Sequence, residues 1–569
     1  MSHRPSRLVL IAALLLAALL LPVPAAPAPA AESNGPPPAQ TVDVQVLAIN
    51  DFHGSLEPPG GTFFGAPAGG AAYLATVIRQ LSDGVRNNVV VSSGDLIGAS
   101  PLLSALFHDE PTIEAMNQIG LQLNAVGNHE FDEGVDELRR MQRGRCHPVD
   151  GCQDGDGFAG ADFDFLAANV FDEDTGRTIF PPYRIMNLNG TRVAFVGMTL
   201  EGTPSIVTPS GVAGLDFRDE AVTVNALVPR LRDDGVESIV VLLHEGGFTT
   251  GGVNDCPGVS GPIVDIVARL DDEIDAVLSG HTHRAYNCAL PNAAGHPILV
   301  TSASSFGRVV TDVQLRIDRG TRDVVSAQAE NLIVRRDVEP AADITDLIAE
   351  YDAIAAPLRD RVIGQITSTI DKAADASGEN PAGNLIADAQ LAATAPAGFG
   401  AAQIAFMNPG GVRDPGFIFD QPAGTGGAIT YGEAFTVQPF GNSLVTMTLT
   451  GAQIYELLKE QWCQSAPKVL LPSAGFHYAW SQSEDPCAGD GRVVTGSVTL
   501  DGAPVDLAQP YRVTVNSFLA EGGDGFPVLP QGTDRLGGAV DLDALEDYFV
   551  AAPNQTLSPP PLDRVDVQP

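Results

Sequence analysis

The sequence predicts an α/β fold in two domains, and three observations support this prediction. The chain has 569 residues, more than a single hydrophobic core usually organises. Hydrophobic residues make up 44% and charged residues 18% of it, which is typical of globular proteins. From residue 42 to residue 337, short apolar runs alternate with amphipathic stretches of helical period. This alternation is the pattern of strands sandwiched between layers of helices.

The N-terminal segment predicts export. Arg4 and Arg7 precede an apolar run from Leu8 to Leu21, and small residues and prolines follow as far as Ala31. This is the anatomy of a secretory signal peptide, because the apolar run is too short and too soon interrupted by proline for a membrane-spanning helix. We therefore expect residues 1–31 to be removed. The mature protein is expected to be secreted, extracellular or periplasmic, with no membrane insertion.

The cysteines and the net charge agree with export. Six cysteines form three pairs of sequence neighbours, which predicts structural disulfides, although six cysteines permit 15 connectivities. The guessed pairs are Cys146–Cys152, Cys256–Cys288 and Cys463–Cys487. The formal net charge is −38, so the surface repels nucleic-acid polymers and anionic membranes. A phosphate ester would be repelled as well, unless bound metal ions concentrate positive charge at the site.

Residues 42–337 are predicted to form the first domain. Its strands are expected at Val44–Ile49, Val89–Ser92, Leu123–Val126, Val193–Val196, Ile239–Leu243, Ala276–Leu278 and Ile298–Thr301. Its helices are expected at Ala71–Leu81, Val135–Met141, Ala221–Leu231 and Ile263–Leu270. Runs such as Ser238–Leu243 are apolar on both faces, as expected for strands covered on both sides. The Gly-rich loop with Asp150, Asp154 and Asp156 lacks the residue order of an EF-hand, so we interpret it as a solvated loop.

The second domain is predicted to follow a connecting helix. Residues 338–361 carry apolar residues at helical spacing and predict that helix. An α+β pattern then occupies residues 362–550, with a helix at Asn384–Ala392 and strands at Ser443–Leu449, Val493–Leu500 and Tyr511–Asn516. The Pro-rich residues 551–569 are predicted to be a disordered tail.

Five short segments carry most of the chemistry, and each follows directly on a predicted strand. They are Asn50-Asp51-Phe52-His53-Gly54, Ser93-Gly94-Asp95, Gly127-Asn128-His129-Glu130-Phe131-Asp132, Leu243-His244-Glu245-Gly246 and Gly280-His281-Thr282-His283. The carboxyl ends of strands line the ligand crevice of an α/β sheet. We therefore expect all five segments to meet at one edge of one sheet.

The residue types in these segments predict a two-metal centre. Carboxylate and amide oxygens mixed with imidazoles suit Mn²⁺, Zn²⁺, Co²⁺ or Fe ions rather than a thiolate site. Two neighbouring ions need one bridging carboxylate, and Asp95 is the only acid of its segment. A single Asp or His at a turn is usually structural. Five of the ten histidines lie in these segments, however, which disfavours the structural alternative.

The ordered set of segments resembles the calcineurin-like metallophosphoesterases, in the branch of bacterial periplasmic 5′-nucleotidases/UDP-sugar hydrolases and ecto-5′-nucleotidase. The resemblance implies a four-layer β-sandwich flanked by helices. It also implies that one metal is bound by Asp51, His53, Asp95 and His283, and the second by Asp95, Asn128, His244 and His281. His129 would then stabilise the transition state, with Asp132 holding it in place.

Three further segments resemble the substrate-binding domain of the same family. They are Asn408-Pro-Gly-Gly-Val-Arg413, Gln438-Pro-Phe440-Gly-Asn442 and Phe518-Leu-Ala-Glu-Gly-Gly-Asp524-Gly. The resemblance implies that Phe440 and Phe518 clamp the base, that Asn408 and Asn442 make polar contacts, that Arg413 meets phosphate or ribose and that Asp524 accepts hydrogen bonds from the ribose hydroxyls. The family often has an arginine before the helix of this domain, where this chain has Lys372.

The function implied by the resemblance is that of a dinuclear metal-dependent 5′-nucleotidase acting on small nucleotides. Two alternatives stay within the hydrolases: a 2′,3′-cyclic-nucleotide 2′-phosphodiesterase/3′-nucleotidase and a UDP-sugar diphosphatase. A third, from another class, is a non-catalytic nucleotide-binding or adhesion protein.

Overall fold

The structure is a computed structural model that describes residues 40–568, except residues 208, 421–425, 465, 484, 486 and 488–490. The predicted signal peptide, residues 1–31, lies outside the described residues. Among the helices of the described ranges, none combines the length and apolar character needed to cross a membrane.

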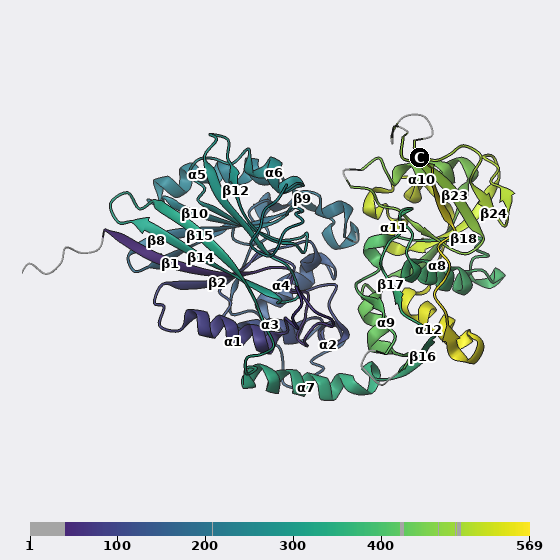
Figure 1. Ribbon diagram of the computed structural model, residues 1–569, viewed down its shortest axis with the longest axis horizontal. Coiled ribbons are helices and arrows are strands. Elements are labelled where there is room, and N and C mark those ends of the chain that lie inside the picture. The colour runs from purple at the N-terminus through teal and green to yellow at the C-terminus, as the bar shows by residue number, and fades with distance from the viewer. Residues whose placement is uncertain are drawn as a thin grey trace, which may run out of the picture. The chain divides into compact units, whose positions relative to one another are not determined.

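Two six-stranded sheets form the centre of the first half of the chain (Figure 1). The first contains, in spatial order, β15 (Val324–Ile333), β14 (Val309–Asp318), β1 (Thr41–Ile49), β2 (Asn88–Ser92), β3 (Leu123–Ala125) and β4 (Asp164–Leu166). The second contains β12 (Ala285–Pro291), β13 (Pro297–Ala303), β11 (Ala276–Ser279), β10 (Ser238–His244), β8 (Thr191–Thr199) and β7 (Tyr183–Leu188). The motif-bearing strands pair in parallel within each sheet, β1 with β2 and β2 with β3, and β10 with β11.

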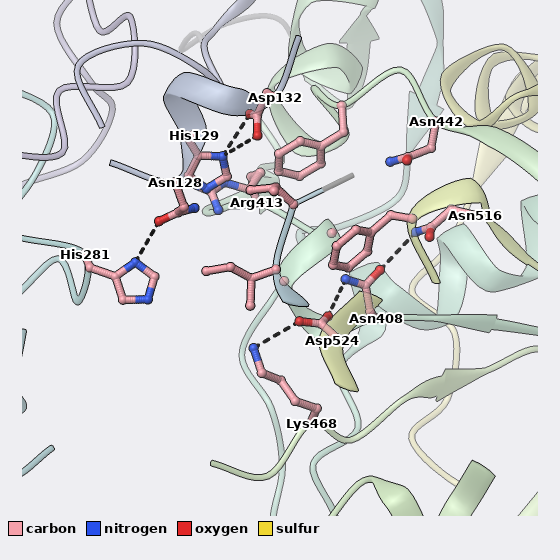
Figure 2. A pocket seen from close by; sticks show the side chains of 16 residues that line it. Asn128, His129, Asp132, His281, Asn408, Arg413, Asn442, Lys468, Asn516 and Asp524 are labelled. Atoms are coloured by element: carbon pink, nitrogen blue, oxygen red, sulfur yellow. Dashed lines mark hydrogen bonds and ion pairs between the residues drawn. The ribbon is translucent and has the colours of Figure 1, made fainter. Parts of the chain in front are cut away.

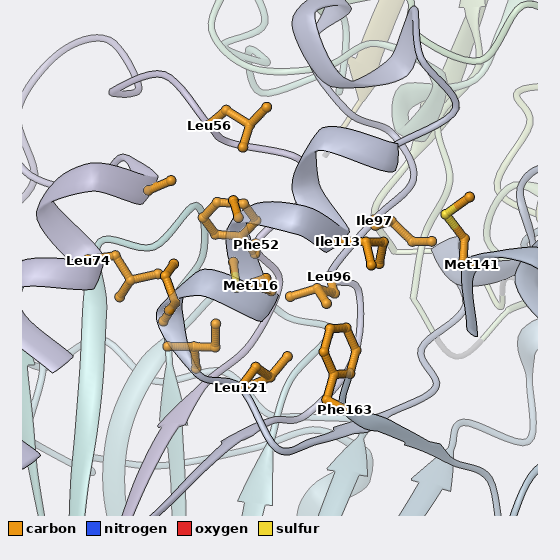
Figure 3. Packing of buried hydrophobic residues seen from close by; sticks show 14 of the residues in the cluster. Phe52, Leu56, Leu74, Leu96, Ile97, Ile113, Met116, Leu121, Met141 and Phe163 are labelled. Carbon is orange, nitrogen blue, oxygen red and sulfur yellow. The ribbon is translucent and has the colours of Figure 1, made fainter. Parts of the chain in front are cut away.

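Three apolar cores separate the layers. Val44, Val46 and Ala48 of β1 face Val240 and Leu242 of β10 in a core between the two sheets. The alternate residues Leu47 and Ile49 instead join a second core. Figure 3 shows part of this core, with Phe52, Leu74 and Met116. This second core contains α1 (Ala71–Ser82), α3 (Glu110–Ile119) and α7 (Ala342–Arg359).

The third core lies beyond the second sheet, where Val241 of β10 packs with α5 (Glu220–Asp233) and α6 (Pro262–Val267). The order is therefore helix, sheet, sheet, helix, and the predicted four-layer α/β fold is confirmed. The expectation that the five segments meet at one edge of one sheet is wrong. The segments instead follow strands of two different sheets. The sequence could not show this, because a strand that is apolar on both faces does not reveal which sheet it joins.

The second half of the chain is built on a five-stranded sheet. Its strands are β22 (Leu471–Pro472), β18 (Ile404–Met407), β26 (Pro510–Asn516), β21 (Ser443–Thr450) and β27 (Thr533–Val540). One core contains α10 (Gly451–Glu460), and another contains α8 (Pro381–Thr394), α9 (Tyr431–Val437) and α12 (Asp541–Ala551). The predicted strand Val493–Leu500 is wrong except for β24 (Thr499–Leu500), because a turn at Gly496, with φ of 79°, interrupts it.

The prediction of a disordered tail at residues 551–569 is also wrong for the part that the structure describes. β29 (Val565–Gln568) pairs in parallel with β23 (Phe476–Ser481). Arg564 is 4% exposed and bonds to Asp388. The prolines of this segment therefore do not prevent the C-terminal residues from packing against the second half of the chain.

Two of the guessed disulfides are present, Cys146–Cys152 and Cys256–Cys288. Cys463 and Cys487 lie within hydrogen-bonding distance of each other. Partial burial and, to a smaller extent, the hydrogen bond to Cys487 raise the pKa of Cys463 to about 11. Their pairing stays a prediction.

Candidate active site

The predicted metal ligands lie on tight turns at the ends of strands. Asp51 and His53 follow β1, Asp95 follows β2, His244 ends β10, and His281 and His283 follow β11. Five of these residues have φ between 48° and 69°, namely Asp51, His53, Asp95, His281 and His283. Residues other than glycine rarely adopt this left-handed conformation, and they retain it at functional sites where the surrounding structure enforces it.

One group of donors comprises Asp51, His53 and His283, whose ligand atoms all lie within 4.8 Å of one another. The Nε2 atoms of His53 and His283 are 3.1 Å apart, and Asp51 Oδ1 lies 3.4 Å from His283 Nε2. Asp51 and His53 are fully buried. Three protein donors this close together form a natural cation site.

A second group comprises Asp95, His244 and His281, again within 4.8 Å. Asn128 joins it, because its Oδ1 lies 3.2 Å from His244 Nε2 and 3.0 Å from His281 Nδ1. Asp95 Oδ2 lies 3.0 Å from His244 Nε2 and 3.7 Å from His53 Nε2. This single carboxylate therefore stands between both groups, which is the position that a bridging ligand requires.

Backbone carbonyls orient two of the imidazoles. The carbonyl of Gly98 lies 2.9 Å from His53 Nδ1, and that of Ser93 lies 2.8 Å from His244 Nδ1. A carbonyl accepts only, so each Nδ1 carries the proton and each Nε2 lone pair faces the cluster. Metal-binding histidines are usually oriented in this way.

Glu130 organises the loops beneath the site. Its carboxylate is buried and accepts from the backbone N–H of Asp95, at 3.0 Å, and of Gly127, at 2.6 Å. Gly127 must be glycine, because a Cβ there would lie 2.3 Å from Asp95 Oδ1. The glutamate of this segment is thus a structural anchor, not a ligand.

The electrostatics favour neutral imidazoles at most of the donors. Burial holds the pKa values of His53 and His283 well below their usual range and lowers that of His281 to about 3. Burial also opposes charge on His244, but the nearby carboxylates, Asp95 first, outweigh it and raise its pKa to about 10.

His129 and Asp132 form a dyad beside the donors. His129 Nδ1 lies 2.8 Å from Asp132 Oδ2, which also accepts from the N–H of Ala99 at 3.0 Å. Burial works against a charged His129, yet the charges of Asp132 and Asp95 prevail and raise its pKa. These charges therefore favour the protonated form of the imidazole next to the donor groups.

A pocket of about 800 Å³, part of it open to solvent, adjoins the donors. Residues from both halves of the chain line it: Asn128, His129, Asp132, Ile206, Val207, His281, Asn408, Gly410, Gly411, Arg413, Phe440, Asn442, Lys468, Asn516, Phe518 and Asp524. All six predicted substrate-binding residues are among them. Four predicted metal ligands, Asp51, His53, Asp95 and His244, lie deeper, and His283 is also outside the lining.

The pocket has Arg413 and the His129–Asp132 dyad at one end, and at the other, the polar end, a network of hydrogen bonds that includes an ion pair (Figure 2). Phe440 stacks on His129, with ring centroids 5.8 Å apart, and the Arg413 guanidinium lies 5.8 Å from the same Phe440 ring. At the polar end, Asp524 accepts from Asn408 Nδ2 at 2.7 Å and pairs with Lys468 Nζ at 3.1 Å. A flat, partly anionic molecule would meet cations and the imidazole at one side and hydrogen-bonding groups at the other.

Comparison with known families decides the assignment. A family model described as calcineurin-like phosphoesterase matches residues 44–285, and one described as 5′-nucleotidase, C-terminal domain, matches residues 362–531. The chain belongs to the calcineurin-like phosphoesterases of the 5′-nucleotidase type. This confirms the resemblance seen in the sequence.

Individual relatives of this 5′-nucleotidase-type chain carry several names. Endonuclease YhcR of Bacillus subtilis is 31% identical over 90% of this chain, and cell wall protein Lmo0130 of Listeria monocytogenes is 32% identical over 89%. The chain spans only 40% and 66% of the lengths of these two proteins. A 5′-nucleotidase of Vibrio cholerae is 27% identical, with 90% of this chain and 91% of that protein covered.

Among solved structures, the 5′-nucleotidase precursor of Thermus thermophilus is 26% identical, with a TM-score of 0.75. The similarity covers 92% of this chain and 99% of that one.

Sequence reasoning missed some residues of this site. Lys468 and Asn516 line the pocket, and Asn516 donates to Asn408 Oδ1 at 2.9 Å. Lys468 could have been noticed as one of only three lysines in the chain, whereas Asn516 gives no signal. Lys372, which stands where the family often has an arginine, is not among the residues that line the pocket. Burial lowers the pKa of Lys372, and the positive charges of Arg413 and Lys468 lower it further.

Proposed function

We propose that this chain is a secreted, dinuclear metal-dependent 5′-nucleotidase that hydrolyses the phosphate monoester of nucleotides to nucleoside and phosphate. One observation carries the proposal: the carboxylate of Asp95 stands between two groups of donors, beside a pocket whose far end is suited to a nucleoside. The alternatives of a 2′,3′-cyclic-nucleotide phosphodiesterase or a UDP-sugar diphosphatase share the scaffold and are separated by experiment below.

Two divalent ions, Mn, Zn, Co or Fe, fit the chemistry of these donors. Asp51, His53, Asp95 and His283 would hold one ion, and Asp95, Asn128, His244 and His281 the other. When bound, such a pair supplies Lewis-acid polarisation of a phosphoryl group.

The protein's own residues would perform the remaining steps. Arg413 presents a planar, charged fork to the phosphate oxygens. His129, whose pKa Asp132 and Asp95 raise, would in its protonated form stabilise negative charge on the phosphoryl group or donate its proton to the leaving oxygen. Phe440 and Phe518 hold the base by stacking, while Asn408, Asn442 and Asp524 bind polar groups of the nucleoside.

The proposal includes a division of the chain. Residues 1–31 act as signal peptide, 42–337 as catalytic domain, 338–361 as connecting helix and 362–550 as substrate-binding domain. The apolar N-terminal run, the two matched family segments and the helix α7 support this division.

Phosphate release from AMP, UDP-glucose and cyclic 2′,3′-AMP, each with and without metal, tests the proposal. Release from AMP should stop with a chelator and resume with Mn²⁺, and AMP should have the highest kcat/KM. A preference for either other substrate would favour the corresponding alternative. Full activity of metal-free enzyme would refute the two-metal assignment, and loss of all activity at every metal concentration would favour a non-catalytic binding protein.

A further inference from the structure

A second cluster of metal-type donors lies apart from the two groups described above. It comprises His108, between α2 (Leu102–Ala105) and α3; Glu133, just before α4 (Val135–Arg143); Glu137, in the first turn of α4; and His147, in the loop closed by Cys146–Cys152. One ligand atom from each lies within 4.8 Å of the others. None of the four lines the substrate pocket.

The contact between His108 and Glu133 is slightly shorter than the spacing of two ligands around one small ion. His108 Nδ1 lies 2.8 Å from Glu133 Oε2. With metal–ligand bonds of about 2.1 Å, neighbouring ligand atoms are about 3.0–3.4 Å apart. Two imidazoles and two carboxylates form a donor set that Zn²⁺ and similar ions favour.

Asp150 orients both rings. Its Oδ2 lies 2.9 Å from His108 Nε2 and 3.3 Å from His147 Nδ1. The backbone N–H of Asp150 also donates to His147 Nδ1 at 3.2 Å. Binding of an ion at His147 Nε2 would therefore shift the ring proton to Nδ1, where Asp150 Oδ2 can accept it. A carboxylate behind a ligating imidazole is the usual support of a metal-bound histidine.

The burial of the cluster suits a site that is formed but reachable. The side chains of His108, Glu137 and His147 are 17%, 12% and 15% exposed, whereas Glu133 is 46% exposed. The two rings stack with centroids 3.7 Å apart. Solvent can deliver the ion past Glu133, which is the most exposed of the four side chains.

We propose that His108, Glu133, Glu137 and His147 bind one divalent transition-metal ion of the zinc type, in a structural site separate from the catalytic centre. The ion would join three segments that are distant in the chain. Two of them continue into the active site: Asp132 precedes Glu133, and Asp109 accepts from the N–H of Gly98, whose carbonyl contacts His53. The bound ion would therefore brace the turns that hold His53 and the His129–Asp132 dyad.

The rival interpretation is a network held together by a proton. Hydrogen bonding to Glu133 raises the pKa of His108 to about 9, so an imidazolium in the place of an ion would also neutralise the surrounding carboxylates. The two interpretations differ in whether zinc is taken up.

The experiment counts zinc in the full chain. Wild type, His147→Gln and Glu133→Gln are stripped with chelator and dialysed against Zn²⁺ alone, and bound zinc per chain is then measured. His296→Gln is the matched control, because His296 is an exposed histidine paired with Asp272 at 2.7 Å. We expect each cluster variant to hold one ion fewer than wild type and the control to hold the same number as wild type. Zinc should also raise the Tm of wild type and the control by a few degrees more than that of the variants.

Equal zinc counts in all four proteins would overturn the proposal and favour the proton network. Because the readout is a difference between variants, it holds whether the catalytic centre takes two ions or none. If His147→Gln does not fold, Glu133→Gln decides, since the Glu133 side chain is 46% exposed and glutamine has nearly the same shape.

Discussion

At the scale of single residues, the Asp132 carboxylate has a measurable effect on its neighbour His129. Its charge, together with that of Asp95, overcomes burial and raises the pKa of His129. If the protonated imidazole is the working form, activity falls as pH rises through that pKa. Asp132→Asn removes the charge and lowers the pKa, so the alkaline limb of the kcat–pH profile should move to lower pH by about one unit or more. Steady-state kinetics between about pH 5 and pH 10 measure the shift.

Asp136→Asn is the control for this prediction. Asp136 lies close in the chain but is 95% exposed and pairs with Arg139 on the surface. Its loss should leave the profile unchanged. An alkaline limb that stays in place in Asp132→Asn would show that His129 does not set it.

Phe518 offers the clearer test of base stacking. Phe440 also stacks on His129, so its removal would disturb binding and the dyad together. Phe518 lies against Gly523, where an added Cβ would come within 2.5 Å of the ring. Phe518→Ala should raise KM for AMP about 5- to 150-fold, from about 1–3 kcal/mol of stacking, and spare p-nitrophenyl phosphate. Phe399→Ala, at an exposed ring, is the control; equal losses on both substrates would contradict the clamp.

Residues of the site differ in how far the sequence reveals them. The metal donors could be predicted because they cluster in short segments directly after strands, so their spacing carries information. Asn516 and Lys468 stand alone, and only the packing of distant segments brings them to Asp524 and Asn408.

At the scale of elements, the C-terminal segment is the main surprise. Arg564 donates to both oxygens of Asp388 at 2.8 Å and to the carbonyl of Pro472 at 2.8 Å. Its removal would leave a buried carboxylate without its counter-charge, and such losses typically cost about 3–5 kcal/mol. Arg564→Ala should therefore lower the urea midpoint of unfolding markedly. Leu562→Ala, at a side chain 38% exposed, should change it little, and equal midpoints would show that β29 docks weakly.

The wrong element predictions have physical causes. Composition suggested disorder after residue 550 because prolines remove backbone donors, but a single buried ion pair and one parallel strand fix the segment. The strands of the first half were predictable from their apolar runs. Their division between two sheets was not, because it depends on which apolar faces meet, and the sequence records only that both faces are apolar.

At the scale of the whole molecule, α7 links the two halves of the chain that together line the pocket. It packs on α3 in the first half and on α9 in the second. Near its middle, the hydroxyl of Tyr351 meets Glu114 of α3 at 3.1 Å and Asp154, just after the Cys146–Cys152 loop, at 3.0 Å. A hydroxyl has one proton to donate, so the three groups are fully bonded only if one carboxyl is protonated.

This arrangement predicts a pH-dependent stability. Burial, with added repulsion from Asp154 and Asp156, raises the pKa of Glu114 from 4.5 to about 7. A raised carboxyl pKa costs nothing below pH 4.5, where the group is protonated in both the folded and the unfolded chain, and destabilises the fold increasingly as pH rises towards about 7. Because the group is partly solvated, we expect the free energy of unfolding to fall by about 1–2 kcal/mol, less than the full pKa shift would give.

Glu114→Gln keeps a neutral side chain at every pH, so its Tm should fall less than that of wild type between about pH 5 and pH 8. Asp346→Asn, at an exposed position of α7, should follow wild type; parallel curves for wild type and Glu114→Gln would show that Glu114 is ionised in the folded protein throughout this range.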